Sequence, residues 1–497
     1  MKTRRKLLHT FLMTVSLLAG STLFAGSGSS TVIPVPHHDA VSPFFSVQAE
    51  GKDLSAAAYK DFHYASFQQK GALRFTIKCA EEVKEFSISP LSKNIKGKLT
   101  GGNTIEFSLP QPSYIVVTVN GKTRLFLFGE ALQQNMPANS ISILQYGVDA
   151  TGQKLNTASI QKAINETAVR KKTLFFPAGI YKTGRLTIPS NARIFLSPGA
   201  LLKASDELAD LEAPGQQKPR GFFNIINAEN VQISGLGIID GNGRYLREKF
   251  GDAARLRLLF VSGSKNISIT GITERDPGSW NTQIMYSDYV TFKNVKQLND
   301  ASLANTDGFD PDASSFVTIE NCFGYCGDDN VAIKVTQQNG ARNKVSDIVV
   351  RGCVFLTRKS SLKVGTESRG ESFTNILFED NDVILSDRGM ALYCSDGALY
   401  ENIRYINNRF EENYADAKRM GIHFTINKRN VDSKPGIMKN VLIDNCHFYR
   451  PFPNLSEIAG LNDQHTIDVK VKNLTIGERK AGNEDIKTSF ASIKFYN

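Results

Sequence analysis

The chain has 497 residues, of which 41% are hydrophobic and 22% are charged. This length allows two or three domains, or one elongated repeat domain with an extra module, and the composition is that of a folded protein rather than a disordered one. The net charge of +10 favours an anionic substrate, but the basic residues are scattered instead of gathered in blocks. We therefore expect no nucleic-acid partner.

The first 25 residues are typical of a secretory signal peptide. A basic start, Lys2–Lys6, precedes the apolar run Leu7–Leu18, and small residues follow up to Ala25. No later stretch approaches the roughly 20 apolar residues of a membrane span. The six cysteines are too sparse for a disulfide scaffold. We expect a secreted or periplasmic protein, without a membrane span and monomeric.

Two segments precede the main part of the chain. Residues 26–40 are rich in Gly, Ser and Pro and predict a flexible lead-in. Residues 41–135 contain short β-type runs separated by Gly, Asn and Pro, with an Asn-Gly hairpin signal in Val119–Lys122. This pattern predicts a small β-sandwich, which either binds sugar or packs against the C-terminal part of the chain. The predicted strands are Ala72–Lys78, Glu85–Ile88, Thr104–Leu109, Tyr114–Val119 and Leu125–Phe128.

A repeat in the C-terminal part predicts a solenoid. Residues 157–169 have apolar positions at helical spacing, and this helix would cover the open end of the repeat array. Beyond residue 220, a polar residue, an apolar one, any residue and another apolar one recur every 23 to 38 residues. This period, with β-type repeats, predicts a parallel β-helix over 140–490. The motifs begin at Asn230, Asn266, Tyr289, Phe316, Asp347, Asn375, Asn402, Asn440 and Asn473.

The repeat also accounts for three cysteines. Cys322, Cys353 and Cys446 follow their motifs at the same place, which predicts small buried side chains stacked inside the solenoid. A disulfide or a metal site is the alternative. Asn321, Asn381 and Asn445 occupy a comparable position and would form stacked amides at a corner. Residues 203–220 are polar and without a period, and predict a protruding loop.

The chemistry is expected in two acidic motifs, Asn305–Asp310 and Gly327–Asn330. Asp307 lies 21 residues before Asp328, about one coil of the solenoid, so the two motifs would lie on adjacent turns. Crowded carboxyls raise the pKa of one while the others stay ionised. Such a set can protonate a leaving group and activate a water. Ordinary turn chemistry is the alternative for either motif alone.

Five motifs follow one another along the chain: Ile239–Gly243, Arg257–Phe260, Ser279-Trp280, Asn305–Asp310 and Gly327–Lys334. They occur in the order found in the polygalacturonase-like glycoside hydrolases (family 28), which residues 140–480 resemble. The resemblance implies a right-handed parallel β-helix and inverting hydrolysis with no metal and no other cofactor. It implies that Asp328 is the general acid and that Asp307 and Asp329 hold and deprotonate the attacking water. Inverting enzymes separate acid and base carboxyls by roughly 6.5–9.5 Å.

Two departures from the family pattern affect substrate binding. The Gly-His-Gly of the family is replaced near Lys359–Leu362, and its Arg-Ile-Lys, which grips a galacturonate carboxylate, is replaced within Gly389–Cys394. A lost cation removes a charge-assisted contact. Lys334, Lys363 or Arg388 could compensate.

The remaining candidates for substrate binding have structural alternatives. Asn305 and Asp310 belong to the acidic motif, and Lys363 is either a ligand or a structural partner of Glu367. The other three are Trp280 (sugar platform or core), Gln283 (hydroxyl ligand or packing) and His423 (replacement for the missing histidine, or a satisfied half-buried imidazole).

The sequence thus predicts a secreted enzyme that hydrolyses an α-linked, pectin-type polysaccharide or oligosaccharide. A neutral α-linked glucan or galactan is the alternative substrate. From other classes, a polysaccharide lyase would need a Ca²⁺ site and an Arg or Lys base, and a non-catalytic glycan-binding β-helix would not need mutually repelling acids.

Overall fold

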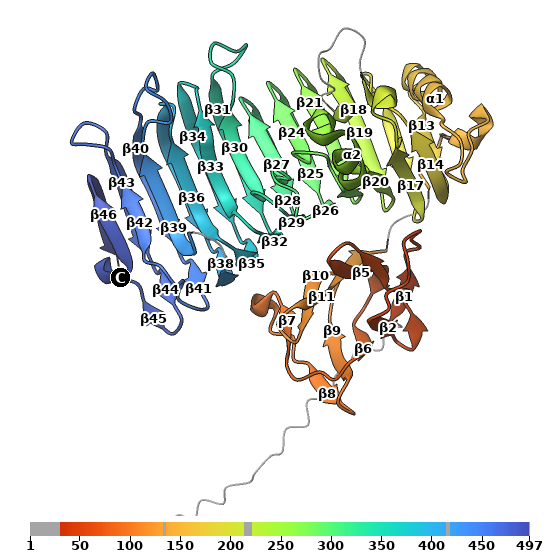
Figure 1. Ribbon diagram of the computed structural model, residues 1–497, viewed down its shortest axis with the longest axis horizontal. Coiled ribbons are helices and arrows are strands. Elements are labelled where there is room, and N and C mark those ends of the chain that lie inside the picture. Colours follow the sequence, from red (N-terminus) through yellow and green to blue (C-terminus); the bar gives the residue numbers. More distant parts are fainter. Residues whose placement is uncertain (1–29, 133–135, 213–220, 414–417, 497) are drawn as a thin grey trace, which may run out of the picture.

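The computed structural model describes residues 30–132, 136–212, 221–413 and 418–496, which form two units packed side by side (Figure 1). The N-terminal unit is a β-sandwich and the larger one is a right-handed parallel β-helix. The predicted fold class is confirmed. The predicted signal peptide lies outside the described residues. Within the described ranges, no helix is both long enough and apolar enough to cross a membrane.

The sandwich consists of a six-stranded and a five-stranded sheet. Its two inner faces enclose an apolar core of their own. The six-stranded sheet contains β1 (Thr31–Pro34), β4 (Ala57–Tyr59), β5 (Phe62–Lys70), β7 (Phe86–Ser89), β10 (Tyr114–Val119) and β11 (Thr123–Ala131). The five-stranded sheet contains β2 (Phe45–Ala49), β3 (Lys52–Asp53), β6 (Leu73–Cys79), β8 (Lys98–Thr100) and β9 (Thr104–Leu109).

The expected flexible lead-in is wrong for Thr31–Pro34. These residues form β1, which pairs antiparallel with β5. Backbone hydrogen bonds to a neighbouring strand order this segment, although its Pro-rich composition indicates a loop. The predicted hairpin is confirmed, because β10 and β11 pair across Asn120 and Gly121.

The solenoid is built from three parallel sheets. The first sheet has 13 strands, from β12 (Ser140–Ser142) to β47 (Ala491–Tyr496). The second has 12 strands, from β14 (Gly179–Thr183) to β45 (Arg479–Lys480), and its last pair, β44–β45, is antiparallel. The third has 11 strands, from β15 (Leu186–Thr187) to β46 (Ile486–Ser489). Each coil contributes one strand to each sheet, so equivalent residues of adjacent coils lie about 4.8 Å apart.

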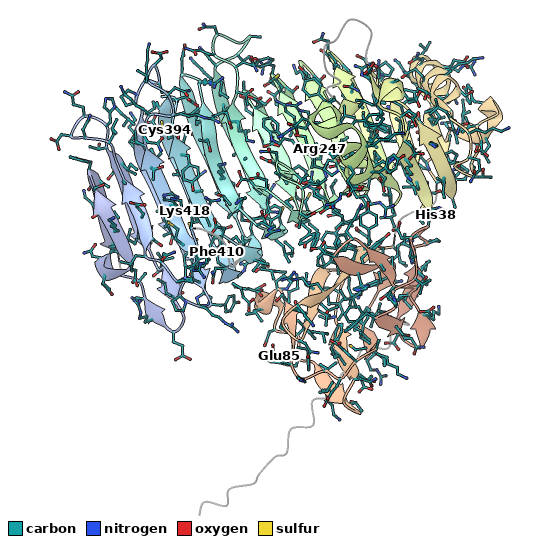
Figure 2. The ribbon with its side chains drawn as sticks, viewed as in Figure 1. His38, Glu85, Arg247, Cys394, Phe410 and Lys418 are labelled. Atoms are coloured by element: carbon teal, nitrogen blue, oxygen red, sulfur yellow. The ribbon has the colours of Figure 1, made fainter. Side chains whose placement is uncertain are left out.

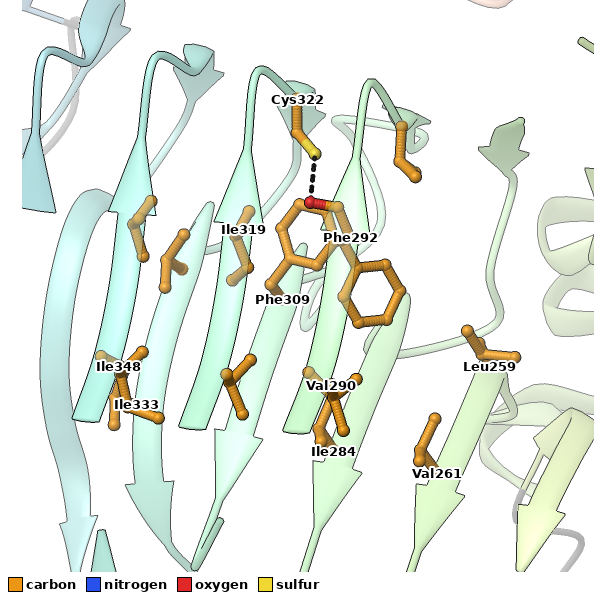
Figure 3. Close-up of a cluster of buried hydrophobic side chains, with 14 of the residues drawn as sticks. Leu259, Val261, Ile284, Val290, Phe292, Phe309, Ile319, Cys322, Ile333 and Ile348 are labelled. Carbon is orange, nitrogen blue, oxygen red and sulfur yellow. Dashed lines mark hydrogen bonds between the residues drawn. The ribbon is translucent and has the colours of Figure 1, made fainter. Parts of the chain in front are cut away.

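Apolar side chains from all three sheets fill the solenoid. In Figure 3, Val290 and Phe292 of β25 (Asp288–Lys293) lie opposite Ile284 and Phe309 of the third sheet. The Phe292 and Phe309 rings are 5.2 Å apart. The cysteine prediction is confirmed: Cys322 and Cys353 are free, buried and adjacent, with the Cys322 amide donating to the Cys353 Sγ at 3.4 Å.

The corner prediction for asparagines is wrong at Asn381. Asn321 and Asn445 occupy the corner of their coils and have left-handed backbone conformations. In the coil of Asn381, the corner position is occupied by Asp380 instead. Asn381 itself is buried and donates to Asn408 at 2.9 Å, in line with the cysteines. Buried amides must find hydrogen-bond partners, and stacking on the next coil supplies one.

The repeat motif begins at a backbone kink. Its first residue has a positive φ in each coil of the first sheet from Asn230 to Asn440, a conformation that Asn adopts more readily than most residues. The motif at Asn473 differs, because it leads into β44 (Thr475–Ile476) of the second sheet.

Two helices accompany the solenoid. Helix α1 (Thr157–Val169) covers its N-terminal end as predicted, with Ile160 and Ile164 in the core (Figure 1). Helix α2 (Gly243–Phe250) was not predicted and packs near the turn at Pro277 and Gly278. In the predicted loop at 203–220, the structure describes a short 3₁₀ turn, Leu208–Leu211.

The six-stranded sheet of the sandwich packs against the second sheet of the solenoid. Side chains fill the space between the two units (Figure 2), and the apolar ones, including Phe126, Phe128 and Phe323, form a shared core. Buried charges also cross this boundary: Lys296 binds Glu130 at 2.7 Å, and Arg275 binds Asp39. The sandwich is therefore an integral side wall of the solenoid rather than a tethered module.

Candidate active site

The acidic motifs lie on two adjacent turns between the second and third sheets. Asp307 lies between β26 (Lys296–Leu298) and β27 (Phe309–Asp312). Asp328 and Asp329 lie between β29 (Phe323–Cys326) and β30 (Val331–Val335). Because β27 and β30 are paired, the two turns are neighbours. One carboxylate oxygen from each of Asp307, Asp328 and Asp329 lies within 4.8 Å of the other two. These oxygens are closer than the carboxyl separation typical of inverting enzymes.

Two glycines let the turns approach this closely. A Cβ at Gly308 would lie 2.4 Å from the Asn330 carbonyl oxygen. A Cβ at Gly327 would lie 2.5 Å from Thr306 Oγ1 and 2.7 Å from the Leu303 oxygen. The glycines of the two motifs are thus required by close packing.

A buried lysine neutralises each of two carboxylates. Lys334 Nζ is 2.9 Å from Asp307 and 2.8 Å from Asp310, and Lys363 Nζ is 2.6 Å from Asp329. Asp329 also accepts from the Ser360 amide at 2.8 Å. Lys363 pairs with Asp329, which corrects the expected alternative of a pair with Glu367. Among the described residues, Asp328 has no such ion pair.

This asymmetry separates the pKa values of the three acids. Burial, with the nearby charges of Asp329 and Asp307, raises the pKa of Asp328 to about 7. Burial also raises the pKa of Asp307, although Lys334 opposes it. At Asp329, burial is outweighed by Lys363 and Arg388, and the pKa is lowered. Asp328 is therefore partly protonated near neutral pH beside an ionised Asp329.

Three close carboxylates could also bind a cation. The donor set does not fit one well, because Lys334 and Lys363 already neutralise two of the three acids. A divalent ion at these carboxylates would lie close to both ammonium groups, whose positive charge would repel it.

Side chains from the next coils extend the site. Lys363 of β33 (Ser360–Ser368), Ala391 of β36 (Arg388–Cys394) and His423 of β39 (Met420–Ile426) are successive rungs of the third sheet. The His423 Nδ1 is 2.7 Å from the Tyr393 hydroxyl. Burial, with Lys418 and Arg388, lowers the pKa of His423 to about 4. His423 is thus a neutral, hydrogen-bonded imidazole near the site.

The structure does not support three substrate contacts predicted from the sequence. Asp310 is fully buried and holds Lys334, and Gln283 is 2% exposed and donates to Asp312 at 2.8 Å. Asn305 is half-buried and accepts from Arg255. These three side chains are engaged by other residues of the protein, and the sequence motifs do not show such contacts.

Trp280 is half-buried beside the carboxylates. Lys334 Nζ lies 3.8 Å from its ring centre, and the Arg257 guanidinium lies 5.0 Å away. Trp280 thus makes cation–π contacts with two basic residues, one of which is Lys334. Its role as a sugar platform stays a prediction.

Sequence reasoning missed the role of Tyr393. It lies within Gly389–Cys394, the segment in which the sequence predicts a replaced Arg-Ile-Lys, and its ring lies 5.5 Å from Lys363 Nζ while its hydroxyl lies 2.7 Å from the His423 Nδ1. That expected replacement was the signal in the sequence that could have drawn attention to Tyr393.

A sequence profile of glycosyl hydrolases family 28 matches residues 168–423. A probable polygalacturonase of Vitis vinifera is 29% identical over 40% of this chain, and the match spans 44% of that protein. An exo-poly-alpha-D-galacturonosidase of Dickeya chrysanthemi is 24% identical over 71% of this chain and 73% of that protein. The chain thus spans less than half of the first relative.

Solved structures show the same fold. A Thermotoga maritima exopolygalacturonase has a TM-score of 0.60 at 20% identity and covers 74% of this chain and 92% of its own. Dex49A from Penicillium minioluteum has a TM-score of 0.64 at 13% identity and covers 93% and 96%. At such identities the likeness describes architecture alone.

Proposed function

The chain belongs to glycosyl hydrolases family 28 and is a glycoside hydrolase, and from this premise we propose that it cleaves α-linked, galacturonate-containing polysaccharide. The observation that carries the mechanism is the difference among three neighbouring acids. Asp328 has no ion pair among the described residues and a pKa of about 7, whereas Asp307 and Asp329 each bind a lysine.

In the proposed mechanism, Asp328 donates its proton to the glycosidic oxygen. Asp307 and Asp329 hold a water, take one of its protons and direct its oxygen to the anomeric carbon. Lys363 lowers the pKa of Asp329 and so keeps it ionised, as a base requires, whereas at Asp307 the charge of Lys334 only opposes the effect of burial, which raises the pKa. Two carboxylates can hold a water between them, which supports direct displacement with inversion. The close approach of the acids makes the stereochemistry the sharpest test of this proposal.

The acidic substrate is supported by the cations around the site. Lys363 and Arg388 lie next to Asp329, and Arg388 is fixed by Asp387 at 3.3 Å. A uronate carboxylate would meet these cations in place of the usual Arg-x-Lys pair. Relatives that match the chain include proteins named for polygalacturonan and for xylogalacturonan hydrolysis.

The test is an assay of the purified protein on homogalacturonan, rhamnogalacturonan, dextran and galactan. We expect new reducing ends from a galacturonan, with the inverted anomer seen first by NMR. The matched control is Asp328→Asn, which keeps the shape of the turn. Cleavage of dextran or galactan alone would contradict the proposed acidic substrate. A product that retains the anomeric configuration would contradict the proposed inverting mechanism. Release of unsaturated, ultraviolet-absorbing products would indicate a lyase.

We also propose that the enzyme is exported, on the strength of the signal-like residues 1–25. Expression of the full chain in a bacterial host, followed by N-terminal sequencing of the periplasmic or secreted product, tests this. Retention in the cytoplasm with an intact N-terminus would contradict it.

A further inference from the structure

The five-stranded sheet of the sandwich has a free outer face. This sheet lies opposite the one that packs on the solenoid, and β8 marks the end of the sandwich far from the solenoid (Figure 1). Along β6, buried and exposed residues alternate, which directs Arg74, Thr76 and Lys78 outward. Residues 93–96, at the end of and after the 3₁₀ turn Leu91–Lys93, line a groove together with residues of this sheet.

This groove has a volume of ≈ 620 Å³. It is within the size range of carbohydrate and small-molecule sites. Its polar lining comes from both sides, with Arg74, Thr76, Glu106 and Ser108 on the sheet and Lys93 and Lys96 on the turn.

The groove is positively charged. Arg74, Lys93 and Lys96 are exposed and form no ion pair among the described residues, and Glu106 is the single acid of the lining. Glu106 stands opposite Lys98 of the neighbouring strand, which offsets its charge. Surface lysines of the solenoid often have partners instead, as Lys293 does with Glu320 at 2.9 Å. Three like charges around one groove repel each other, and an anionic ligand would relieve that repulsion.

We propose that this sandwich groove binds a stretch of acidic polysaccharide through its carboxylates, separately from the cleft that carries Asp328. The proposal rests on the proposed function for the class of polymer. The aromatic rings at the groove, Phe75 and Phe107, stack on each other 5.1 Å apart and are buried, so recognition depends on charge and hydrogen bonds. Charge-based binding at an exposed site weakens as salt rises.

The rigid attachment of the sandwich gives this groove a consequence for catalysis. Because buried contacts fix the sandwich to the solenoid, a chain held in the groove is held at a fixed position relative to the cleft. Two sites on one polymer bind more tightly than either alone if the polymer spans both. The groove would therefore lower the KM for long chains and leave short oligomers unaffected.

The experiment compares two triple variants of the full-length chain. The test variant is Arg74→Glu, Lys93→Glu and Lys96→Glu. The control, Lys122→Glu, Lys472→Glu and Lys494→Glu, makes the same charge change at exposed lysines outside the groove. Binding to polygalacturonate is measured in an Asp328→Asn background, so that the polymer is not consumed. Turnover of trigalacturonate and of long chains is measured with Asp328 intact.

We expect the test variant to bind the long polymer at least tenfold more weakly at low salt, with a shallower salt dependence than the control. Its KM for long chains should rise while turnover of trigalacturonate stays unchanged. Equal binding of polygalacturonate by both variants would contradict the proposal. So would binding of double-stranded DNA to the unmodified groove that is as tight as the binding of polygalacturonate. If the protein instead cleaves no galacturonan at all, the proposed function fails, whichever variant binds.

Discussion

Replacing Lys363 by Met tests the electrostatic design of the site. The substitution keeps the apolar stem and removes the ammonium that lies 2.6 Å from Asp329, where the two side chains are 11% and 4% exposed. Removing one partner of a buried ion pair costs about 3–5 kcal/mol. Since the Ser360 amide and Arg388 still stabilise the Asp329 carboxylate, we expect about 3 kcal/mol, or about 2 pKa units.

The sign of the pH dependence follows from Asp329. Its folded pKa now lies below its unfolded value, so the ionised form stabilises the fold above that value and this contribution is lost as pH falls through the folded pKa. Without Lys363, the folded pKa rises above the unfolded one. The variant should therefore lose most stability near neutral pH and least below pH 4, as measured by urea unfolding at several pH values.

Activity should respond in the same direction. If Asp329 must be ionised, the acidic limb of kcat/KM moves up by about 2 pH units in Lys363→Met. The matched control is Lys344→Met, whose exposed pair with Glu371 at 3.3 Å should contribute at most about 1 kcal/mol. An unmoved acidic limb, with a stability loss no larger than that of the control, would refute the reasoning. So would strict additivity of Lys363→Met and Asp329→Asn in a double-mutant cycle.

Three further predictions concern the acid, the domain boundary and the turn. Asp328→Asn should lower kcat about 10³-fold without changing the circular dichroism, and should abolish the alkaline limb that we expect for the wild type near pH 7; wild-type activity rising with pH past 8 would contradict the acid role. Arg275→Met leaves the carboxylates of Asp39 and Asp240 buried without their cation, at a cost of about 3–5 kcal/mol, so calorimetry should show a lower unfolding temperature, and Arg275→Lys should recover part of it. Gly327→Ala must displace the loop that holds Asp307, and we expect kcat to fall about 10²-fold; wild-type turnover would show that the loop tolerates the shift.

The solenoid could be predicted because its cause is local and repeated. The first residue of each motif, most often an Asn, supplies the left-handed kink, and alternating apolar residues supply the inward face. The coil length then brings Asp307 beside Asp328, which the structure bears out. The kink and the inward-facing residues of a coil can each be predicted from a few neighbouring residues of the sequence.

The rest depends on contacts between distant segments. Whether Gln283 points to solvent depends on Asp312 of the next coil, and the pairing of Lys363 with Asp329 depends on a register that no motif contains. Strand β1 forms because β5 is present as a partner. The apolar face of the six-stranded sheet, with Phe126 and Phe128, cannot be distinguished in the sequence from the core of the sandwich. In the structure it is one side of the interface between the sandwich and the solenoid.

That interface has a consequence for biosynthesis. The sandwich is complete once β11 has left the ribosome, yet the solenoid strands that cover Phe126 and Phe128 follow only from Leu298 to Leu385. During this interval the nascent sandwich exposes the apolar surface that the solenoid later covers. Such a surface binds chaperones or causes aggregation. A polypeptide shortened to begin at residue 136 would lack the sandwich, and its solenoid would permanently expose the apolar surface from Leu298 to Leu385. It should be recovered in inclusion bodies unless the missing half is supplied as a separate chain.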